Sequence, residues 1–523
     1  MFESAKSFFS KNYVFIAIIV ILLTAAFLRL YKIEDYMTFL GDEGRDVTIV
    51  RGILHGDFTF LGPRASAGDF FLGPIYYYFM APFLFISNYN PVGPAVMVAL
   101  LGVATVFLVY RVGREFFGNS AGLVAAALYA VSPLVITYSR SSWNPNVMPF
   151  FSLLTLYTAY KAIENKKKYL FIISGIFLGI LIQLHYLAIF VAAILFFYIL
   201  FSEILDGEKK NILIALFKKY ILTFTGFLIG ISPFLLFELR HGFPNTKTIF
   251  QFIFFSGNVA SSGKFTDVIG DVFFRMFGRL ITFYPSPERF IFFSKPFLAV
   301  LFYLTLILAF VSLGLILYQL FLSIKKKNKD AHKYLLISFW IGLGVLFFGL
   351  YKKPVYDYYF GFMFPAPFLL VGNVFAFFSK NKFLKVAGVI IIALLIWYNL
   401  TGNPFRHLAN RQYRQVEKIS KFVLEKSGGK PYNFALLTLG NSDHAYRYIF
   451  EVNNRPPVVI QNPQADPERK SVTDQLFVVC EDQNCQPRGA SLWEVAGFGR
   501  AEIEGEWPVS VVKVYKLVHF VDQ

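Results

Sequence analysis

Charged residues are scarce in this sequence of 523 residues. Asp, Glu, Lys and Arg make up 16%, whereas hydrophobic residues make up 56% and aromatic residues 19%. This balance argues against a soluble protein of several domains and is typical of a membrane protein. Phe is the extreme case, with 64 residues.

The common soluble catalytic motifs are also absent. The sequence has no Gly-x-Gly-x-x-Gly after a strand, no Walker loop, no Asp-x-Asp on the predicted cytoplasmic face, no His-Glu-x-x-His and no Ser/His/Asp pattern. Soluble nucleotide-sugar chemistry therefore has no visible site. The only two cysteines, Cys480 and Cys485, have no nearby His and argue against zinc. On an oxidising side of a membrane they could close a small disulfide loop.

Long apolar runs predict eleven membrane-spanning helices. The first run is too long for a cleavable signal peptide and lacks a small-residue cleavage site, so we expect it to remain as an anchor. The predicted spans cover residues 14–31, 91–110, 120–138, 147–163, 169–184, 186–202, 219–238, 296–321, 334–350, 359–378 and 385–402.

Lys and Arg cluster on alternate connections between these spans, which the positive-inside rule assigns to the cytoplasm. The N-terminus is then cytoplasmic and the C-terminus extracytoplasmic. Residues 403–523 carry 15 Lys and Arg against 14 Asp and Glu, so nearly all of the net charge of +17 belongs to the membrane part. The basic balance thus reflects topology, and nucleic acid is not an expected partner.

The chain divides into a membrane domain, residues 1–402, and a polar extracytoplasmic domain, residues 403–523. In the second domain, which we call the tail, a helix is expected over 410–426 and strands over 433–437, 476–480 and 509–519. This order predicts a small α/β domain.

An acidic cluster, Gly41-Asp42-Glu43-Gly44-Arg45-Asp46, follows directly after the first span. Paired carboxylates at this position are costly to desolvate and suggest a reaction centre at the membrane surface. A solvated turn after a helix is the alternative interpretation.

Other unusual polar residues fall in the predicted outside loops. Lys352 and Lys353 oppose the inward bias of basic residues, which an anionic ligand would explain; snorkelling to lipid phosphates is the alternative. An ordinary structural role also remains open for the other candidates: a loop ion pair, an interfacial Tyr belt, a helix cap or a hydrogen-bonded His. These candidates are Arg64, Asp69, Tyr77, Asn144, His185, Arg240 and Tyr358.

Three segments resemble the GT-C glycosyltransferases, in particular the protein O-mannosyltransferases and the aminoarabinose transferases of lipid A. They are Asp42-Glu43-Gly44-Arg45-Asp46, Leu72-Gly73-Pro74-Ile75-Tyr76-Tyr77-Tyr78 and Trp143-Asn144-Pro145. The resemblance covers roughly residues 10–402. It implies an all-α polytopic membrane protein with about eleven transmembrane helices, amphipathic helices in the first outside loop and a small C-terminal α/β domain.

The resemblance also implies an activity. Such enzymes use polyprenyl-phosphate sugars at the outer leaflet, so a hexosyl or pentosyl group would pass, with inversion, to a hydroxyl of a glycan, lipid or protein. By its place in the motif Asp42 would be the base, and Glu43 an orienting or metal-binding group. Position in the outside loops, not a motif match, adds Arg64, Lys352, Lys353, Arg240 and His185 as candidates for the donor phosphate. Further candidates are Asp69, Tyr77, Asn144 and Tyr358 for substrate, and Glu43 and Asp69 for a divalent metal, the only cofactor considered. The tail resembles no domain of known function, and we expect it to lie above the outer mouth and to shape acceptor choice.

The sequence departs from these relatives at two places. Asn144 and Asn146 stand where the relatives often carry an acidic residue, and Gly73 stands where the aminoarabinose enzymes have Lys. Two other functions remain in view: a transporter or lipid flippase, and a receptor with a sensing tail. Transporters usually place charges near the membrane midplane, whereas these spans are nearly free of them, which favours a surface reaction.

Overall fold

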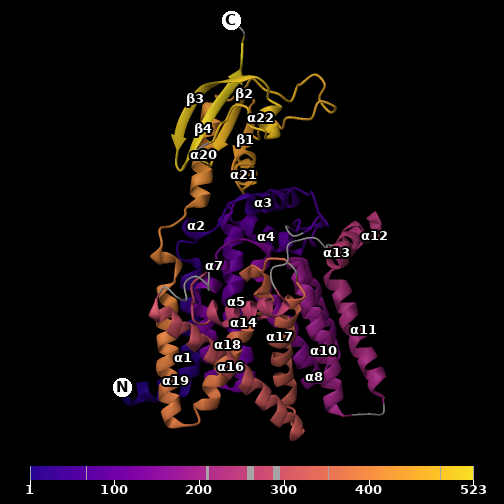
Figure 1. Cartoon of the computed structure of the whole chain (residues 1–523), viewed down its shortest axis with the longest axis vertical. Coiled ribbons are helices and arrows are strands. Elements are labelled where there is room, and N and C mark those ends of the chain that lie inside the picture. The colour runs from indigo at the N-terminus through magenta and orange to yellow at the C-terminus, as the bar shows by residue number, and fades with distance from the viewer. Residues whose placement is uncertain are drawn as a thin grey trace.

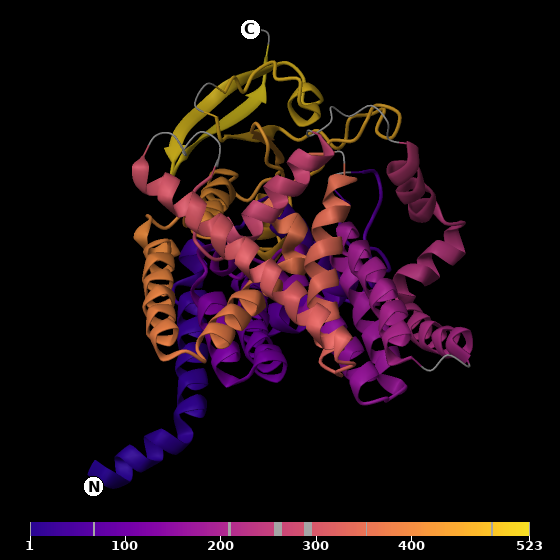
Figure 2. The same ribbon diagram turned by 60° about the horizontal axis from the view of Figure 1, so that its bottom comes forward.

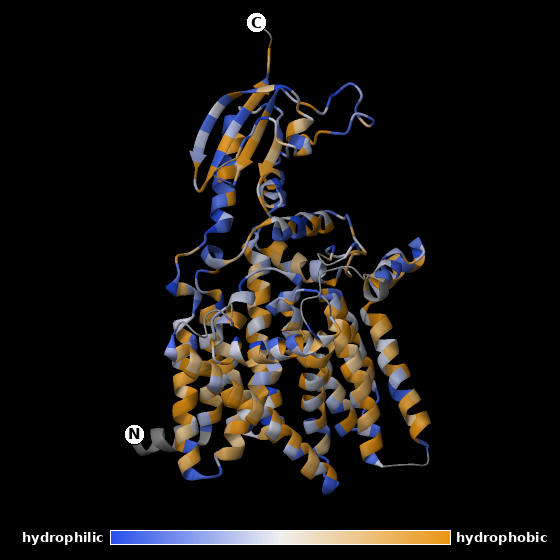
Figure 3. Ribbon diagram, in the orientation of Figure 1, coloured by the Kyte–Doolittle hydropathy of each residue, from blue (hydrophilic) through white to orange (hydrophobic). Residues whose placement is uncertain are grey.

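The computed structural model describes residues 2–65, 68–207, 211–255, 264–286, 295–351, 353–482 and 485–521. A bundle of apolar helices forms one end of the molecule and the tail forms the other (Figure 1). Hydrophobic residues dominate the bundle, whereas the tail alternates hydrophobic and hydrophilic segments (Figure 3). The chain is thus an all-α membrane-type bundle with a small α/β domain, as the sequence predicts.

Seven helices in the described part of the chain are long and apolar enough to cross a membrane. An eighth span results if η4 (Asp357–Met363) and α18 (Pro365–Phe378), which meet at 56°, form one crossing. The seven are Asn12–Leu30 within α1 (Phe2–Leu30), α5 (Val92–Phe117), Tyr186–Asp206 made of η2 (Tyr186–Ala188) and α10 (Ile189–Asp206), α11 (Ile212–Gly230), α16 (Pro296–Lys325), α17 (Ala331–Gly349) and α19 (Lys382–Thr401).

The other predicted spans are shorter helices. The run 120–138 is divided at Ser132 because Pro133 has no N–H to donate and its ring clashes with the preceding turn. The run 219–238 likewise breaks near Pro233, and its first helix begins earlier, at Ile212. These shorter helices are α6 (Asn119–Val131), α7 (Pro133–Tyr138), α8 (Met148–Glu164), α9 (Tyr169–Leu184) and α12 (Ser232–His241).

Glycines allow α9 and α11 to pack backbone against backbone. A Cβ atom on Gly226 would lie 1.9 Å from the carbonyl oxygen of Ile172, and one on Gly175 would lie 2.0 Å from that of Thr223. Small residues permit this close approach between apolar helices. The contact holds α9 against α11, and His185 follows directly after the last residue of α9.

Short helices cover the end of the bundle that faces the tail. Between α1 and α5 the chain forms α3, which lies between the bundle and the tail in Figure 1. Figure 2 shows the tail again at the end of the molecule far from the N-terminus. The helices of this layer are α2 (Ile33–Tyr36), α3 (Gly41–Leu54), α4 (Ile75–Ile86), η1 (Asn144–Val147), α13 (Pro244–Phe255), α14 (Phe265–Gly278) and η5 (Pro404–Arg406).

The tail is a four-stranded sheet with helices, in the strand order β1-β2-β4-β3. Strands β1 and β2 are parallel, with Ala435 opposite Val478, and the other two pairs are antiparallel. Its elements are α20 (Gln412–Lys426), β1 (Asn433–Leu437), α21 (His444–Val452), β2 (Gln475–Cys480), α22 (Trp493–Ala496), β3 (Ala501–Val509) and β4 (Val512–His519).

The helix and the first two strands that the sequence predicts in the tail are present. The predicted strand at 509–519 is instead the end of β3, a turn and β4. Strand β3 lies at the sheet edge with Glu502 and Glu504 exposed. Its sequence does alternate, with Ala501, Ile503 and Trp507 separated by Glu502, Glu504 and Glu506, which is typical of a half-exposed strand, but no strand was predicted over these residues.

The tail contacts α3 through two glycines. A Cβ atom on Gly44 would lie 2.3 Å from the backbone nitrogen of Ala445, at the start of α21, and one on Gly41 would lie 2.0 Å from the Oγ of Ser442. The N–H of Arg411 also donates to the carbonyl of Asp35 at 2.9 Å. At Gly44 the backbone of α3 therefore lies directly against the start of α21.

Replacing Gly44 with Ala should loosen this contact, because the new methyl group meets backbone that cannot rotate away. Overpacking of this kind costs about 1–3 kcal/mol. We expect Gly44→Ala to raise the rate of tryptic cleavage between residues 403 and 411. Gly52→Ala, on the same helix, is the matched control, since its Cβ would lie 3.6 Å from that of Asp57. Equal cleavage rates in the two variants would contradict the proposed role of Gly44.

Candidate active site

The acidic cluster forms the first turn of α3. Its carboxylates are there stabilised by the free N–H groups and the positive end of the helix dipole. The carboxylate of Glu43 accepts from the N–H of Leu40 at 3.0 Å, and the Oδ1 of Asn441 in the tail accepts from the N–H of Gly41 at 2.9 Å. Two N–H groups that have no backbone partner at this end of the helix are therefore paired with side chains, one from α3 and one from the tail.

The two neighbouring carboxyl groups differ in how deeply they are buried. The Asp42 side chain is 56% exposed, whereas Glu43 is 7% exposed. Burial raises the pKa of Glu43 to about 7, although its hydrogen bond to the backbone of Leu40 opposes the shift. Adjacent residues of one turn thus differ in their chemistry: Asp42 faces solvent and Glu43 faces protein.

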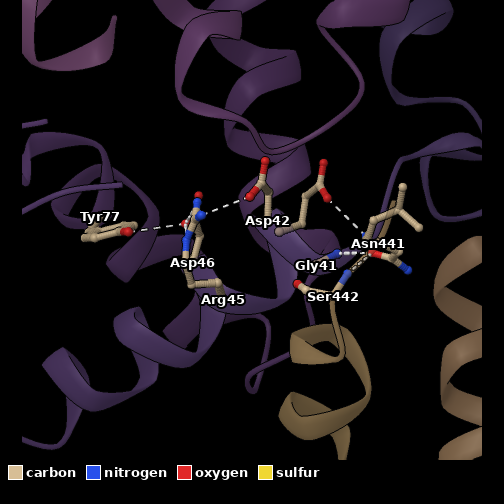
Figure 4. A network of polar contacts seen from close by, with 9 residues as sticks. Gly41, Asp42, Arg45, Asp46, Tyr77, Asn441 and Ser442 are labelled. Carbon is tan, nitrogen blue, oxygen red and sulfur yellow. Dashed lines mark hydrogen bonds and ion pairs between the residues drawn. The ribbon is translucent and has the colours of Figure 1, made fainter. Parts of the chain in front are cut away.

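Behind Asp42, a chain of charges leads into the protein (Figure 4). Arg45 donates to Asp42 at 2.9 Å and to the fully buried Asp46 at 2.7 Å and 3.0 Å. The hydroxyl of Tyr77 donates to the same Asp46 oxygen at 3.3 Å. Burial raises the pKa of Asp46 to about 6, against the opposing effect of Arg45. This chain fixes Arg45, which in turn orients the Asp42 carboxylate.

Two pockets meet at Asp42. The first, which we call the loop pocket, has a volume of about 600 Å³. The described residues that line it are Asp42, Arg45, Pro63, Arg64, Ala65, Gly68, Asp69, Leu72, Trp143, Asn144, Pro145, His185, Tyr186 and Tyr358. The second, which we call the tail pocket, has a volume of about 500 Å³. Its described lining residues are Thr38, Leu40, Gly41, Asp42, Glu43, Thr137, Tyr138, Ser141, Trp143, Asn146, Gly440, Asn441 and Ser442. Asp42 and Trp143 line both. A group bound in either pocket can therefore reach the Asp42 carboxylate.

A small hairpin forms one wall of the loop pocket. Arg64 pairs with Phe71 in an isolated antiparallel bridge and forms an ion pair with Asp69. The N–H of Phe71 donates to the side chain of Asn245 at 2.8 Å, which ties the hairpin to α13. Arg64 is 59% exposed, so its guanidinium remains open to the pocket.

His185 contributes a neutral hydrogen-bonding group. It is 5% exposed, and burial lowers its pKa to about 3. Its Nδ1 accepts from the N–H of Leu187 at 3.3 Å, which assigns the proton to Nε2. The sequence analysis grouped His185 with the cations, but in this environment it can hold an anion only as a neutral N–H donor.

The structure brings most of the predicted site residues together. Those that line the loop pocket are Asp42, Arg64, Asp69, Asn144, His185 and Tyr358, and Glu43 lines the tail pocket. Asn144 does not cap its own helix; its amide donates to the carbonyl of Leu184 at 2.6 Å.

Three of the predicted residues lie elsewhere. Tyr77 is buried behind Arg45 and Asp46, where it supports the site but lines neither pocket. Arg240, exposed on α12, and Lys353, whose Nζ lies 3.8 Å from the centre of the Phe252 ring, also line neither pocket. Lys352 lies outside the described residues.

Several residues of the site were not predicted from the sequence. Arg45 and Asp46 belong to the acidic motif, but no function was predicted for them. The i, i+3 spacing from Asp42 to Arg45 could have indicated their ion pair, because such residues lie on the same face of a helix. Asn441 and Ser442 are separated from Asp42 by about four hundred residues, and no local pattern indicates their contact.

The disulfide expected from the sequence is present between Cys480 and Cys485. Within the described ranges, no three His, Cys, Asp or Glu side chains come close enough to hold a metal ion. Of the two expected ligands, Glu43 accepts from Leu40 and Asp69 pairs with Arg64.

The raised pKa of Glu43 predicts a dependence of stability on pH. Below pH 4.5 Glu43 is protonated in the folded and the unfolded chain; between pH 4.5 and 7 only the unfolded chain releases the proton. Rising pH therefore favours unfolding in this window. We expect the wild type to lose about 1–3 kcal/mol more stability there than Glu43→Gln, whose amide keeps the acceptor for Leu40. Thermal unfolding at several pH values measures this difference, and parallel curves for the two proteins would contradict the assignment.

Part of the chain is similar in sequence to known proteins. Residues 72–237 match the family model of the dolichyl-phosphate-mannose-protein mannosyltransferases. In Bacillus subtilis (strain 168), the "Putative mannosyltransferase YycA" is 25% identical over 201 residues, which are 38% of this chain and 29% of that protein. The "Putative mannosyltransferase YkcB" is 26% identical over 152 residues, 29% of this chain and 21% of that protein. The matches thus cover less than a third of either relative.

Two solved structures share the architecture over nearly the whole chain. ArnT from Cupriavidus metallidurans, bound to undecaprenyl phosphate, has a TM-score of 0.57 and 13% identity, and the match covers 97% of this chain and 98% of that one. AglB, the oligosaccharyltransferase of Archaeoglobus fulgidus, in complex with an inhibitory peptide and a dolichol-phosphate, has a TM-score of 0.52 and 14% identity over 90% and 70% of the two chains. The resemblance to the GT-C superfamily of membrane glycosyltransferases is therefore confirmed, in fold over nearly the whole chain and in sequence over residues 72–237.

Proposed function

We propose that this protein is a membrane glycosyltransferase that moves a sugar from a polyprenyl-phosphate donor to an acceptor hydroxyl at the outer face of the membrane. The observation that carries this proposal is the position of Asp42, an exposed carboxylate where two pockets meet, with arginines in only one of them. A reaction between two substrates needs this arrangement, because each substrate must reach the same reacting point from its own side.

The donor phosphate binds in the loop pocket. Its negative charge grows as the sugar–phosphate bond breaks, so a cation beside it lowers the barrier. Arg45 and Arg64 supply this charge, and the Nε2–H of His185 can donate to a phosphate oxygen without carrying charge itself. The polyprenyl chain lies against the apolar helices of the bundle.

Asp42 acts as the general base. It takes the proton of the acceptor hydroxyl while that oxygen attacks the sugar carbon, and the phosphate leaves with the bonding electrons. A single displacement of this kind inverts the configuration at that carbon. Arg45 orients the Asp42 carboxylate, and Asp46 with Tyr77 holds Arg45.

The donor class is consistent with the neighbours in fold, since the ArnT structure holds undecaprenyl phosphate and the AglB structure a dolichol-phosphate. The two Bacillus subtilis relatives are described as mannosyltransferases, so undecaprenyl-phosphate mannose is the first donor to test. The basic residues on alternate loops support a cytoplasmic N-terminus and a tail on the outside.

Asp42→Asn should abolish transfer while the protein stays folded, because the amide keeps the shape of the side chain but cannot take up the proton. Loss of general-base catalysis costs about 100-fold to 10,000-fold in rate. Transfer of labelled mannose from undecaprenyl-phosphate mannose in liposomes measures the effect. Asp57→Asn, at an exposed position just after the same helix, is the control and should react at the wild-type rate. Near-normal turnover of Asp42→Asn would exclude Asp42 as the base.

Opposite effects are expected from the two members of the hairpin ion pair. Arg64→Gln removes a charge-assisted contact worth about 1.5–3 kcal/mol and should weaken donor binding about tenfold or more. Asp69→Asn frees Arg64 from its partner and removes a negative charge from the pocket, so it should tighten donor binding. Binding of undecaprenyl phosphate to the liposome-embedded protein measures both, with Arg240→Gln as the control outside the pocket. Changes of the same sign in the two variants would contradict this assignment.

A further inference from the structure

We propose that the tail pocket is the acceptor site and that it takes the end of an uncharged saccharide. This inference rests on the proposed function, which it deepens by naming the class of acceptor. The wall that the tail contributes, Gly440–Ser442, makes the C-terminal domain part of the binding site.

The distribution of charge separates the two pockets. Arg45 and Arg64 line the loop pocket, whereas the described residues that line the tail pocket include neither Lys nor Arg. Two carboxyl groups line each pocket, Asp42 and Asp69 in the loop pocket and Asp42 and Glu43 in the tail pocket, so the arginines make the difference in charge. A phosphate or an acidic sugar would be repelled from Asp42 there, while a neutral hydroxyl can approach and lose its proton to it.

The remaining side chains of the tail pocket suit a sugar ring. Trp143 and Tyr138 supply aromatic surface for the apolar C–H face of a pyranose. Hydroxyl groups of Ser141 and Ser442 and the amide of Asn146 can exchange hydrogen bonds with its hydroxyl groups. Mixed aromatic and uncharged polar lining in a pocket of about 500 Å³ fits one or two sugar units better than a lipid chain.

Hydrogen bonds fix residues 440–442, the wall of the pocket that the tail contributes, in position relative to Asp42. Asn441 Oδ1 accepts from the N–H of Gly41 at 2.9 Å and from that of Ser442 at 2.8 Å, while its Nδ2 donates to Glu481 at 3.2 Å. Tyr446 also donates to Glu481, at 3.0 Å. Glu481 directly follows Cys480, whose disulfide closes the same loop. The wall of the pocket and the first turn of α3 are therefore one connected unit.

Gly440 offers a way to fill the tail pocket without disturbing this unit. A Cβ atom on Gly440 would meet no atom within 4 Å, so a large side chain can enter the open space. Leu439 precedes it, is 93% exposed and does not line the pocket. Gly440→Trp and Leu439→Trp thus form a matched pair: the same new side chain, inside the pocket and beside it.

The test measures equilibrium binding to the full-length protein in nanodiscs. The probes are neutral trisaccharides of mannose, glucose and galactose, trigalacturonate as the anionic comparison, and undecaprenyl phosphate. We expect the wild type to bind a neutral trisaccharide and to bind trigalacturonate at least about tenfold more weakly. Gly440→Trp should weaken binding of the neutral trisaccharide about tenfold or more and leave undecaprenyl phosphate binding unchanged, and Leu439→Trp should alter neither.

Three outcomes would overturn the inference: no neutral trisaccharide binds, trigalacturonate binds as well as the neutral probes, or Gly440→Trp weakens undecaprenyl phosphate binding instead. Because binding is measured without turnover, the result stands apart from the transfer assay. Saccharide binding that Gly440→Trp abolishes, in a protein that transfers no sugar, would support the pocket and reject the proposed reaction. Sugar transfer that Gly440→Trp leaves intact, at every neutral acceptor concentration, would support the reaction and reject the pocket.

Discussion

The backbone contact between α3 and α21 is the constraint on which the site depends. Gly41 and Gly44 have no side chains, so the start of α21 can lie directly against the first turn of α3. That turn carries Asp42, and the Oδ1 of Asn441 completes its hydrogen bonding at Gly41. Because the position of the carboxylate and the position of the tail are set by the same contact, neither can shift without the other. A substitution that alters the packing of the tail on α3 would therefore also displace the Asp42 carboxylate.

Electrostatics then assigns different roles to three carboxyl groups within five residues. Burial raises the pKa values of Glu43 and Asp46 to about 7 and about 6, whereas Asp42 stays open to both pockets. Arg45 lies between Asp42 and Asp46 and forms ion pairs with both, which compensates the cost of burying part of its guanidinium. Environment, not residue type, therefore separates the exposed carboxylate of Asp42, the base in the proposed reaction, from the two buried carboxyl groups.

The sequence predicted the features that depend on local pattern. Apolar runs indicated the bundle, and an acidic pair after the first span indicated Asp42, which lines both pockets. The predicted spans 120–138 and 219–238 are not single helices, because Pro133 and Pro233 break them although the composition stays apolar. Strand β3 was missed although its apolar residues alternate with Glu, because the last strand was predicted to begin only at residue 509. Asn441 and Ser442 could not be found, since only the folded chain brings the tail to α3.

In the proposed function, donor and acceptor recognition are encoded in different parts of the chain. The arginines of the loop pocket, Arg45 and Arg64, come from α3 and the loop that follows it, in the membrane domain. The tail pocket takes one wall from residues 440–442, in a segment between β1 and α21 whose Gly440 has open space around it. Hydrogen bonds hold this loop at Asn441, whereas the space around Gly440 is open. A substitution at residue 440 can therefore change the pocket without moving Asp42. Acceptor specificity can therefore diverge in the tail while the charge distribution around the leaving phosphate stays the same.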